Sequence, residues 1–267
     1  MTTASNNTYV YVGAEASGLY RLSPSSSRWE ELTIGLPANP IVPGIAIHPD
    51  NPEVVYVGTQ DGPYRSTDRG GHWERLDYPS SGAPVWTFLF RPGEPKVMYL
   101  GTAPGEIYRS VDDGDSWRKL NATMGSNECN MAFPTRVIAL AADPSHPDEM
   151  YAALEVAGVI RSSDGGDTRD EITGSLAPSE DTLDLHGVQC SAATPHGIHH
   201  YSPRAFHRPR PGQGMDTRGV RPVFSHNLHP GPADSPYRPQ FPVCFHRRFR
   251  PQFPRGFVPQ PGPVQNL

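Results

Sequence analysis

The chain has 267 residues, a formal net charge of −5, 36% hydrophobic residues and 31 prolines, so it can form one large all-β domain or two ordinary ones. Its three cysteines, Cys129, Cys190 and Cys244, are widely and irregularly spaced, which argues against a disulfide framework or a zinc site. We find neither a signal sequence nor an apolar run long enough to cross a bilayer, and we expect a cytoplasmic protein without a membrane partner.

The two parts of the chain differ sharply in composition. Residues 197–267 contain 10 Arg, no Lys, 2 acidic residues and 14 Pro, whereas residues 1–196 contain 13 basic and 26 acidic residues. Prolines at this density prevent a helix or a central strand. We therefore predict a folded domain over 1–196 and a disordered Pro-, Arg- and His-rich tail over 197–267.

Segments rich in β-branched and aromatic residues recur in the first part and predict strands. They lie at 9–13, 54–58, 97–101 and 150–153. A further apolar run closed by a proline turn precedes the last three, at 45–50, 86–93 and 137–144. Pro ends such a strand without the loss of a ladder hydrogen bond.

A short box follows three of these strands, with a Ser, an Asp two residues later and a Gly two residues after that. The Asp side chain can accept hydrogen bonds from nearby backbone N–H groups, and Gly tolerates the positive φ of a tight turn. A Trp three residues after the Gly supplies an apolar plug in two of the boxes, and Arg169 replaces it in the third. The predicted box residues are Ser66, Asp68, Gly70 and Trp73, then Ser110, Asp112, Gly114 and Trp117, then Ser162, Asp164 and Gly166.

The spacing predicts four-stranded antiparallel blades of a β-propeller. Tyr20, Tyr64 and Tyr108 follow one another at 44 residues, and Ile160 follows 52 residues later because of an insertion around 123–134. One complete unit is predicted to have strands over 45–48, 54–59, 63–67 and 72–77.

The predicted ring is incomplete, with about four blades. The first unit has no inner strand, and it carries Ser23–Ser27 where the Asp and Gly of a box would stand, although Trp29 is in register. Residues 185–192 predict the inner strand of another unit, after which the pattern changes.

The box Ser-x-Asp-x-Gly-x-x-Trp, preceded by Tyr-Val-Gly-Thr and Tyr-Arg-Ser strands, resembles the Asp-box or BNR repeat of sialidases, sortilin-type receptors, xyloglucanases and photosystem II assembly-factor propellers. The resemblance covers about residues 8–192. It implies a propeller whose boxes lie at the periphery, away from the central site. It also raises glycoside hydrolysis as an activity, although the Arg-Ile-Pro type motif of sialidases is absent.

Candidate functional residues are few. Arg21, Arg65, Arg109 and Arg161 recur at the same position in every blade, which indicates a structural role and not a converging substrate site. Five polar residues in the turns between the second and third strands can face a shared rim: Glu15, Gln60, Asp61, Glu106 and Glu155. The insertion over 121–134 is a possible recognition loop or a tolerated surface excursion.

We hypothesise a non-catalytic binding or scaffold module with an unknown protein or glycan ligand. The alternative is a glycoside hydrolase-like protein, of the exo-sialidase or xyloglucanase kind, that lacks part of its catalytic propeller. No nucleotide-binding glycine motif and no metal-ligand spacing is found, so we expect no cofactor and no metal.

Three interpretations of the tail stay open. A change of translation frame near His196 explains why Lys is absent and why the repeat stops within a blade. A native low-complexity arm would bring basic and aromatic residues to nucleic acid. The third interpretation is a second domain.

Overall fold

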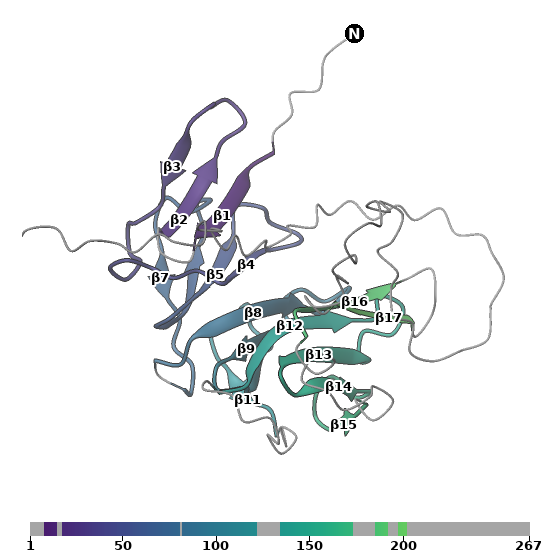
Figure 1. Ribbon diagram of the computed structural model, residues 1–267. Coiled ribbons are helices and arrows are strands. Elements are labelled where there is room, and N and C mark those ends of the chain that lie inside the picture. Colours follow the sequence, from purple (N-terminus) through teal and green to yellow (C-terminus); the bar gives the residue numbers. More distant parts are fainter. Residues whose placement is uncertain are drawn as a thin grey trace, which may run out of the picture. The chain divides into compact units, whose positions relative to one another are not determined.

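The computed structural model describes residues 8–14, 18–80, 82–121, 134–172, 185–191 and 197–201. All of them belong to the first of two compact units, Met1–Gly231 and Pro232–Leu267. The described residues form 17 strands and no helix (Figure 1). This part of the chain accordingly holds no helix that is long and apolar enough to span a membrane.

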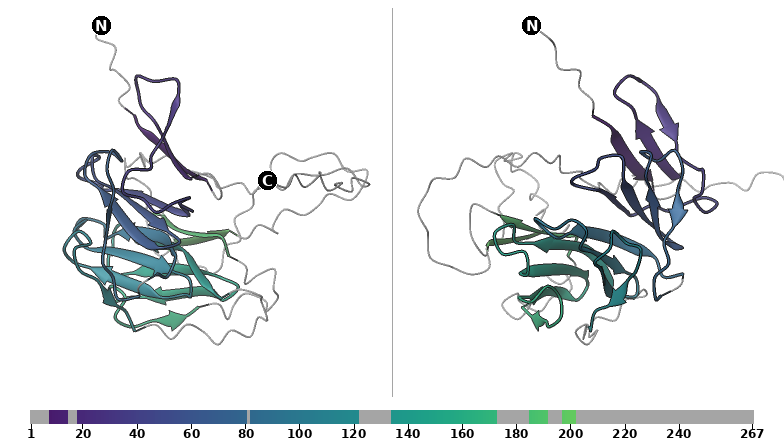
Figure 2. Two further views of the ribbon diagram at one scale, coloured as in Figure 1. Left: turned by 90° about the vertical axis from the view of Figure 1, so that its left-hand side faces the viewer. Right: turned by 180° about the vertical axis from the view of Figure 1, so that it is seen from behind.

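The described strands form five antiparallel sheets, and each sheet consists of strands that are consecutive in the chain (Figures 1 and 2). The first sheet contains β1 (Val10–Ala14), β2 (Gly18–Leu22) and β3 (Trp29–Glu31). The second contains β4 (Gly44–Ile47), β5 (Val55–Thr59), β6 (Gly62–Ser66) and β7 (Glu74–Arg75). The third contains β8 (Val85–Phe90), β9 (Met98–Thr102), β10 (Ile107–Ser110) and β11 (Arg118–Lys119). The fourth contains β12 (Arg136–Ala142), β13 (Met150–Glu155), β14 (Gly158–Ser162) and β15 (Asp170–Glu171). The fifth contains β16 (Gly187–Ser191) and β17 (Gly197–Tyr201).

The prediction of an all-β fold built from four-stranded antiparallel units is confirmed. In the second sheet the first three strands lie within one residue of their predicted bounds. The fourth is shorter than predicted, because only Glu74 and Arg75 pair with β6. The second, third and fourth sheets have four strands each, and the first sheet has no described inner strand.

Strand β17 lies in the segment that we predicted as a tail without strands. It pairs with β16 along its whole length, from Gly187 opposite Tyr201 to Ser191 opposite Gly197. The sequence-based expectation is therefore wrong for these five residues, because pairing with an available strand edge outweighs a weak local strand signal. The rest of the predicted tail, residues 202–267, lies outside the described residues.

Four buried apolar clusters join successive sheets. The cluster between the first and second sheets contains Tyr11 and Leu19 from one side and Val55, Val57 and Trp73 from the other. Similar clusters join the second sheet to the third, the third to the fourth, and the fourth to the fifth. Successive sheets therefore bury apolar faces against one another, as repeat architectures require.

The box turns are held by hydrogen bonds within the turn. In the third sheet, the Ser110 hydroxyl donates to Asp112 Oδ1 at 2.7 Å and accepts from Gly114 N at 2.8 Å. Asp112 Oδ1 also accepts from Ser116 N at 2.9 Å. Ser66, Asp68 and Gly70 in the second sheet and Ser162, Asp164 and Gly166 in the fourth make the same contacts.

A second set of hydrogen bonds joins each box turn to the preceding sheet. Arg69, Asp113 and Gly165 have φ values of 61°, 57° and 70°, which is left-handed backbone. Their carbonyl oxygens accept hydrogen bonds from a tyrosine hydroxyl and an arginine of the sheet before. The donors are Tyr11 and Arg21 for Arg69, Tyr56 and Arg65 for Asp113, and Tyr99 and Arg109 for Gly165, at 2.5–3.3 Å.

The box glycines also permit close packing between sheets. A Cβ atom built on Gly70, Gly114 or Gly166 would lie 2.7, 3.2 or 2.6 Å from a leucine Cδ1 of the preceding sheet. These glycines have φ values between 87° and 95° as well. A side chain at this position would therefore meet both backbone strain and a steric clash.

The buried tryptophan should contribute far more stability than the exposed one. Trp73 is 1% exposed and Trp29 is 49% exposed, although both stand at the same position of the repeat. We expect Trp73→Ala to lower the free energy of unfolding by about 3–5 kcal/mol. We expect Trp29→Ala to change it by less than about 0.5 kcal/mol. Urea unfolding followed by circular dichroism checks both, and equal losses would contradict the assignment of Trp73 as the plug.

Acid should weaken the box turns. Hydrogen bonds from Ser116 hold the pKa of Asp112 below its usual 3.8, and those from Thr168 lower the pKa of Asp164 to about 2. Because each folded-state pKa lies below the unfolded value, the stabilisation is fully present above about pH 4 and is lost as the pH falls toward about 2.

The double variant Asp112→Asn, Asp164→Asn tests this acid dependence. We expect it to be less stable than wild type near neutral pH, and to lose less of its remaining stability during acidification. Urea midpoints measured along the pH series give the comparison. Two parallel curves would show that these carboxylates do not contribute to the acid dependence.

Candidate functional site

The box residues that we predicted lie in structural turns. Asp68, Asp112 and Asp164 accept hydrogen bonds from their own turns, as described above, and the pKa of Asp68 is lowered by the hydroxyl of Ser66. Trp73 and Trp117 are buried between sheets. Every contact that the structure gives these carboxylates is therefore explained by turn formation.

Two of the predicted rim residues, Asp61 and Glu106, each bind a tyrosine hydroxyl and a cationic side chain of their own sheet. Asp61 accepts from the Tyr64 hydroxyl at 3.0 Å and pairs with Arg75 at 3.5 Å. Burial, together with the bond to Asp61, raises the pKa of Tyr64 to about 12. Glu106 in the third sheet accepts from Tyr108 and pairs with Lys119.

The other rim candidates also have local partners. Gln60 accepts from Ile41 N at 2.8 Å, which ties the turn of the second sheet to the segment before β4. Glu155 pairs with Arg136 at 3.0 Å across the first two strands of the fourth sheet. Glu15 lies outside the described residues. No hydrogen bond or ion pair joins any two of the four described candidates, so a shared rim stays a prediction.

The recurrent arginines act between sheets. Arg21, Arg65 and Arg109 bind the box turn of the following sheet, and Arg65 also pairs with Asp115 of that turn at 2.7 Å. Sequence analysis indicated a structural role but not this partner. The available signal was the constant interval of 48 residues from Arg21 to Arg69 and from Arg65 to Asp113.

In the fourth sheet, the equivalent tyrosine and arginine find their hydrogen-bond acceptor within the same sheet. The hydroxyl of Tyr151 donates to Glu149, and the guanidinium of Arg161 contacts the same carboxylate at 3.1 Å. Val54 and Val97 occupy the position of Glu149 in the second and third sheets, because each lies two residues before the equivalent tyrosine. Glu149 therefore takes the acceptor role that a box-turn carbonyl plays between the earlier sheets.

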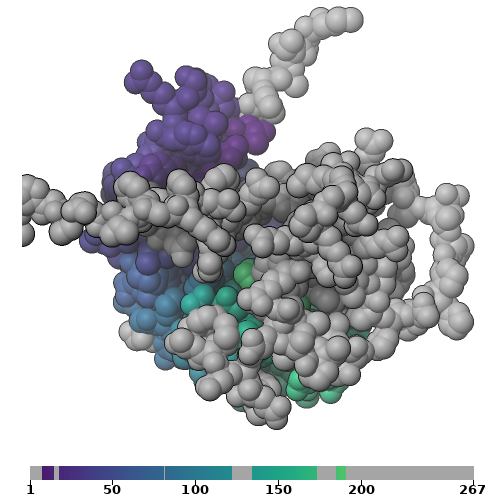
Figure 3. Space-filling view, viewed as in Figure 1, coloured from purple at the N-terminus to yellow at the C-terminus, as the bar shows by residue number. Residues whose placement is uncertain are grey.

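One apolar surface was not predicted. It consists of Val10, Val12, Leu22 and Trp29 on the first sheet, and we call it the first-sheet face. Val10 pairs with Leu22 and Leu22 with Trp29 across the strands, so the side chains of Val10, Leu22 and Trp29 form one row. Val10, Val12 and Trp29 are 39%, 43% and 49% exposed. Residues of the first sheet lie at the surface in Figure 3, coloured purple.

The same face is covered in the second sheet. Val55, Val57 and Trp73 are the equivalents of Val10, Val12 and Trp29, and they are 0%, 0% and 1% exposed. They pack against Tyr11, Leu19 and Leu32 of the first sheet. Among the described residues, no sheet precedes the first one to cover its face, and the first sheet also lacks the box at Ser23–Ser27.

Other predicted features lie outside the described residues. These are positions 122–133 of the proposed recognition loop, the segment after 201, Cys129 and Cys244. Among the residues that the structure describes, no group of three or more His, Cys, Asp or Glu is arranged to hold a metal ion.

Comparisons with known proteins place this geometry in a wider context. No family model matches the chain. A curated xyloglucanase from Paenibacillus sp. is 24% identical in an alignment 218 residues long, and the match covers 67% of this chain and 21% of that protein. The chain thus spans about a fifth of the length of this relative.

Three solved structures share the fold. An ancestral GH74 enzyme matches with a TM-score of 0.55 and 17% identity over 75% of this chain and 29% of its own. The Niastella koreensis GH74 enzyme matches with a TM-score of 0.56 and 15% identity over 74% of this chain and 34% of its own. The extracellular domain of a protein described as a one-component system from B. thetaiotaomicron matches with a TM-score of 0.56 and 19% identity over 74% of this chain and 25% of its own. The described sheets are therefore part of a β-propeller like those of the GH74 structures.

Proposed function

We propose that the chain is a non-catalytic binding or scaffold module, and that the first-sheet face is its protein-binding surface. The main observation behind this proposal is that side chains at equivalent positions of the first and second sheets differ in their exposed fraction. Val12 and Trp29 are 43% and 49% exposed, while Val57 and Trp73 are 0% and 1% exposed. Adjacent apolar side chains that protrude together from a sheet favour contact with a partner.

The covered sheets indicate what kind of partner fits. Each face equivalent to the first-sheet face packs against a sheet that offers a tyrosine and a leucine just after its last strand. In two of the three cases the strand before the last adds an aliphatic residue, Leu19 or Ile107. A partner that presents a β-sheet with the same set of side chains would cover Val10, Val12 and Trp29 in the same way. The stabilisation comes from the apolar area removed from water.

A second copy of the chain offers part of this chemistry. The fourth sheet carries Tyr151, Val159 and, after β15, Ile172 at the corresponding positions, but Tyr151 and Val159 already pack against Leu185 and Val188 of the same chain. Strand β16 contacts β12 and β13, the inner strands of that sheet, while the Arg161 side chain remains 39% exposed and Ile172 is half-buried. The part of the fourth sheet that is left for a partner therefore lies around Arg161 and Ile172. We take head-to-tail association of two copies, the first-sheet face of one on this part of the other, as the interaction to be tested.

Sedimentation velocity over a wide range of protein concentration tests the association. We expect wild type to associate, and Val12→Glu to weaken association by more than tenfold, which corresponds to about 1.4 kcal/mol, because a charge would be buried without a partner. Val111→Glu is the matched control, since Val111 is 61% exposed and lies in a box turn away from this face. Circular dichroism establishes that each variant is folded.

A second variant, Trp29→Ser, tests the same face in case Val12→Glu does not fold. It removes the largest exposed side chain of the face without adding charge. A wild-type chain that stays monomeric at every concentration contradicts association through this face. Equal weakening by Val12→Glu and Val111→Glu would do the same.

Similarity to a xyloglucanase supports one alternative, a glycoside hydrolase-like role. Most glycosidases need two carboxyl groups about 5–9.5 Å apart on either side of the scissile bond. In the described residues, Asp61, Glu106 and Glu155 are each engaged by a tyrosine or a cation of their own sheet. Their existing partners favour the non-catalytic proposal.

Incubation of the chain with xyloglucan separates the two roles. We expect no release of reducing ends above a heat-treated sample, with an active xyloglucanase as the positive control. Release above that background, abolished by Glu106→Gln or Glu155→Gln, would instead support a hydrolase and would identify the carboxylate involved.

A further inference from the structure

Arg169 occupies the position of the apolar plug in the fourth sheet. The turn before it has the same hydrogen bonds as the other boxes, with Gly166 N donating to Ser162 Oγ at 2.8 Å and Thr168 N to Asp164 Oδ1 at 2.8 Å. Gly166 has a φ of 95°, close to the 92° of Gly70. The side chain at 169 is therefore directed as Trp73 and Trp117 are, into the space between sheets.

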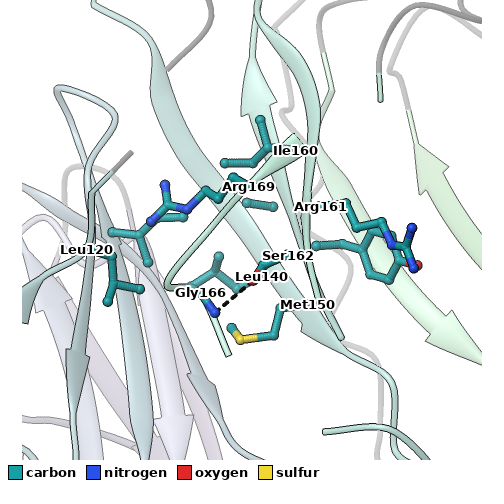
Figure 4. A pocket seen from close by; sticks show the side chains of 11 residues that line it. Leu120, Leu140, Met150, Ile160, Arg161, Ser162, Gly166 and Arg169 are labelled. Carbon is teal, nitrogen blue, oxygen red and sulfur yellow. Dashed lines mark hydrogen bonds between the residues drawn. The ribbon is translucent and has the colours of Figure 1, made fainter. Parts of the chain in front are cut away.

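An apolar pocket receives this side chain (Figure 4). Leu120 from the third sheet and Leu140, Met150 and Ile160 from the fourth line it together with Arg169. Arg161 extends away on the other side of the sheet in Figure 4, and its guanidinium pairs with Glu149. The pocket contains a cavity of about 20 Å³, slightly more than one water molecule needs.

The guanidinium of Arg169 is buried without compensation. Both of its terminal nitrogens are inaccessible to solvent and have no hydrogen-bond partner among the described residues. The charge that acts on it is Asp164, whose carboxylate already accepts from Ser162 and Thr168. Burial lowers the pKa of Arg169 to about 10, so the group is still a cation at neutral pH. An unpaired buried charge is strongly unfavourable, and a counter-ion would relieve that cost.

We propose that this pocket binds a small monovalent anion, of the size of formate or chloride, on the guanidinium of Arg169. A guanidinium presents parallel N–H donors that match a carboxylate, and it is more weakly hydrated than an ammonium group. The apolar walls disfavour a strongly hydrated divalent ion such as sulfate, and the size of the cavity excludes bulky anions. This inference does not depend on the proposed scaffold role.

Thermal unfolding of the full chain in formate, chloride and gluconate at matched ionic strength tests the site. An anion that binds only the folded state, present at about 100 times its Kd, should raise Tm by about 5–10 °C. We expect this rise for wild type in formate and in chloride but not in gluconate. Arg169→Met lacks the guanidinium, and its Tm should be the same in all three salts.

Two further variants separate anion binding from general salt effects. Arg169→Lys keeps the charge but not the parallel donors, so it should retain a smaller response to formate. Arg169→Trp restores the apolar plug of the other boxes, and it should be stable and insensitive to the anion.

A direct measurement covers the case in which a variant does not fold. The ³⁵Cl resonance of chloride should broaden in the presence of wild-type chain and narrow again when formate is added. If wild type shows neither broadening nor an anion-dependent Tm, the pocket does not bind a small anion. A response of the same size in Arg169→Met would also overturn the proposal.

Discussion

The architecture depends on one carbonyl group in each box turn. A residue in left-handed backbone turns its carbonyl oxygen toward the preceding sheet, where a tyrosine hydroxyl and an arginine donate to it. The turn is itself fixed by the Ser and Asp of the box, so local and long-range hydrogen bonds share one short segment. Buried polar groups of this kind must be paired, which is why the contact recurs at each of the first three junctions. Neighbouring sheets are thereby coupled one to the next, as in other repeat proteins.

Much of the fold was predictable because its determinants are local. The spacing of Ser110, Asp112 and Gly114 specifies a turn, and alternating strands flank it, so element types and most bounds followed from sequence. What could not be predicted depends on neighbours in space. The partner of Arg65 lies 48 residues away in another sheet, and the strand at 197–201 exists through its pairing with β16.

The candidate sites lie where the repeat departs from its own pattern. At Ser23–Ser27 the box is lost, and the first sheet has an exposed tryptophan where the second and third sheets have a buried one. At Arg169 the box is intact but the plug is replaced by a cation in an apolar pocket. Both substitutions were visible in the sequence, but exposure and burial were not. Local departures from a consistent pattern are the positions where function or strain is expected.

Glu149 gives the fourth sheet a property that the second and third lack. Those two have valine at this position, and their tyrosine and arginine find an acceptor in the sheet that follows. In the fourth sheet a carboxylate supplied by the same strand accepts from Tyr151 and Arg161. For these donors, one valine-to-glutamate difference replaces an acceptor in the following sheet by an acceptor in the same strand. The fourth sheet thus depends on the segment after it only for cover of its apolar face, which Leu185 and Val188 supply.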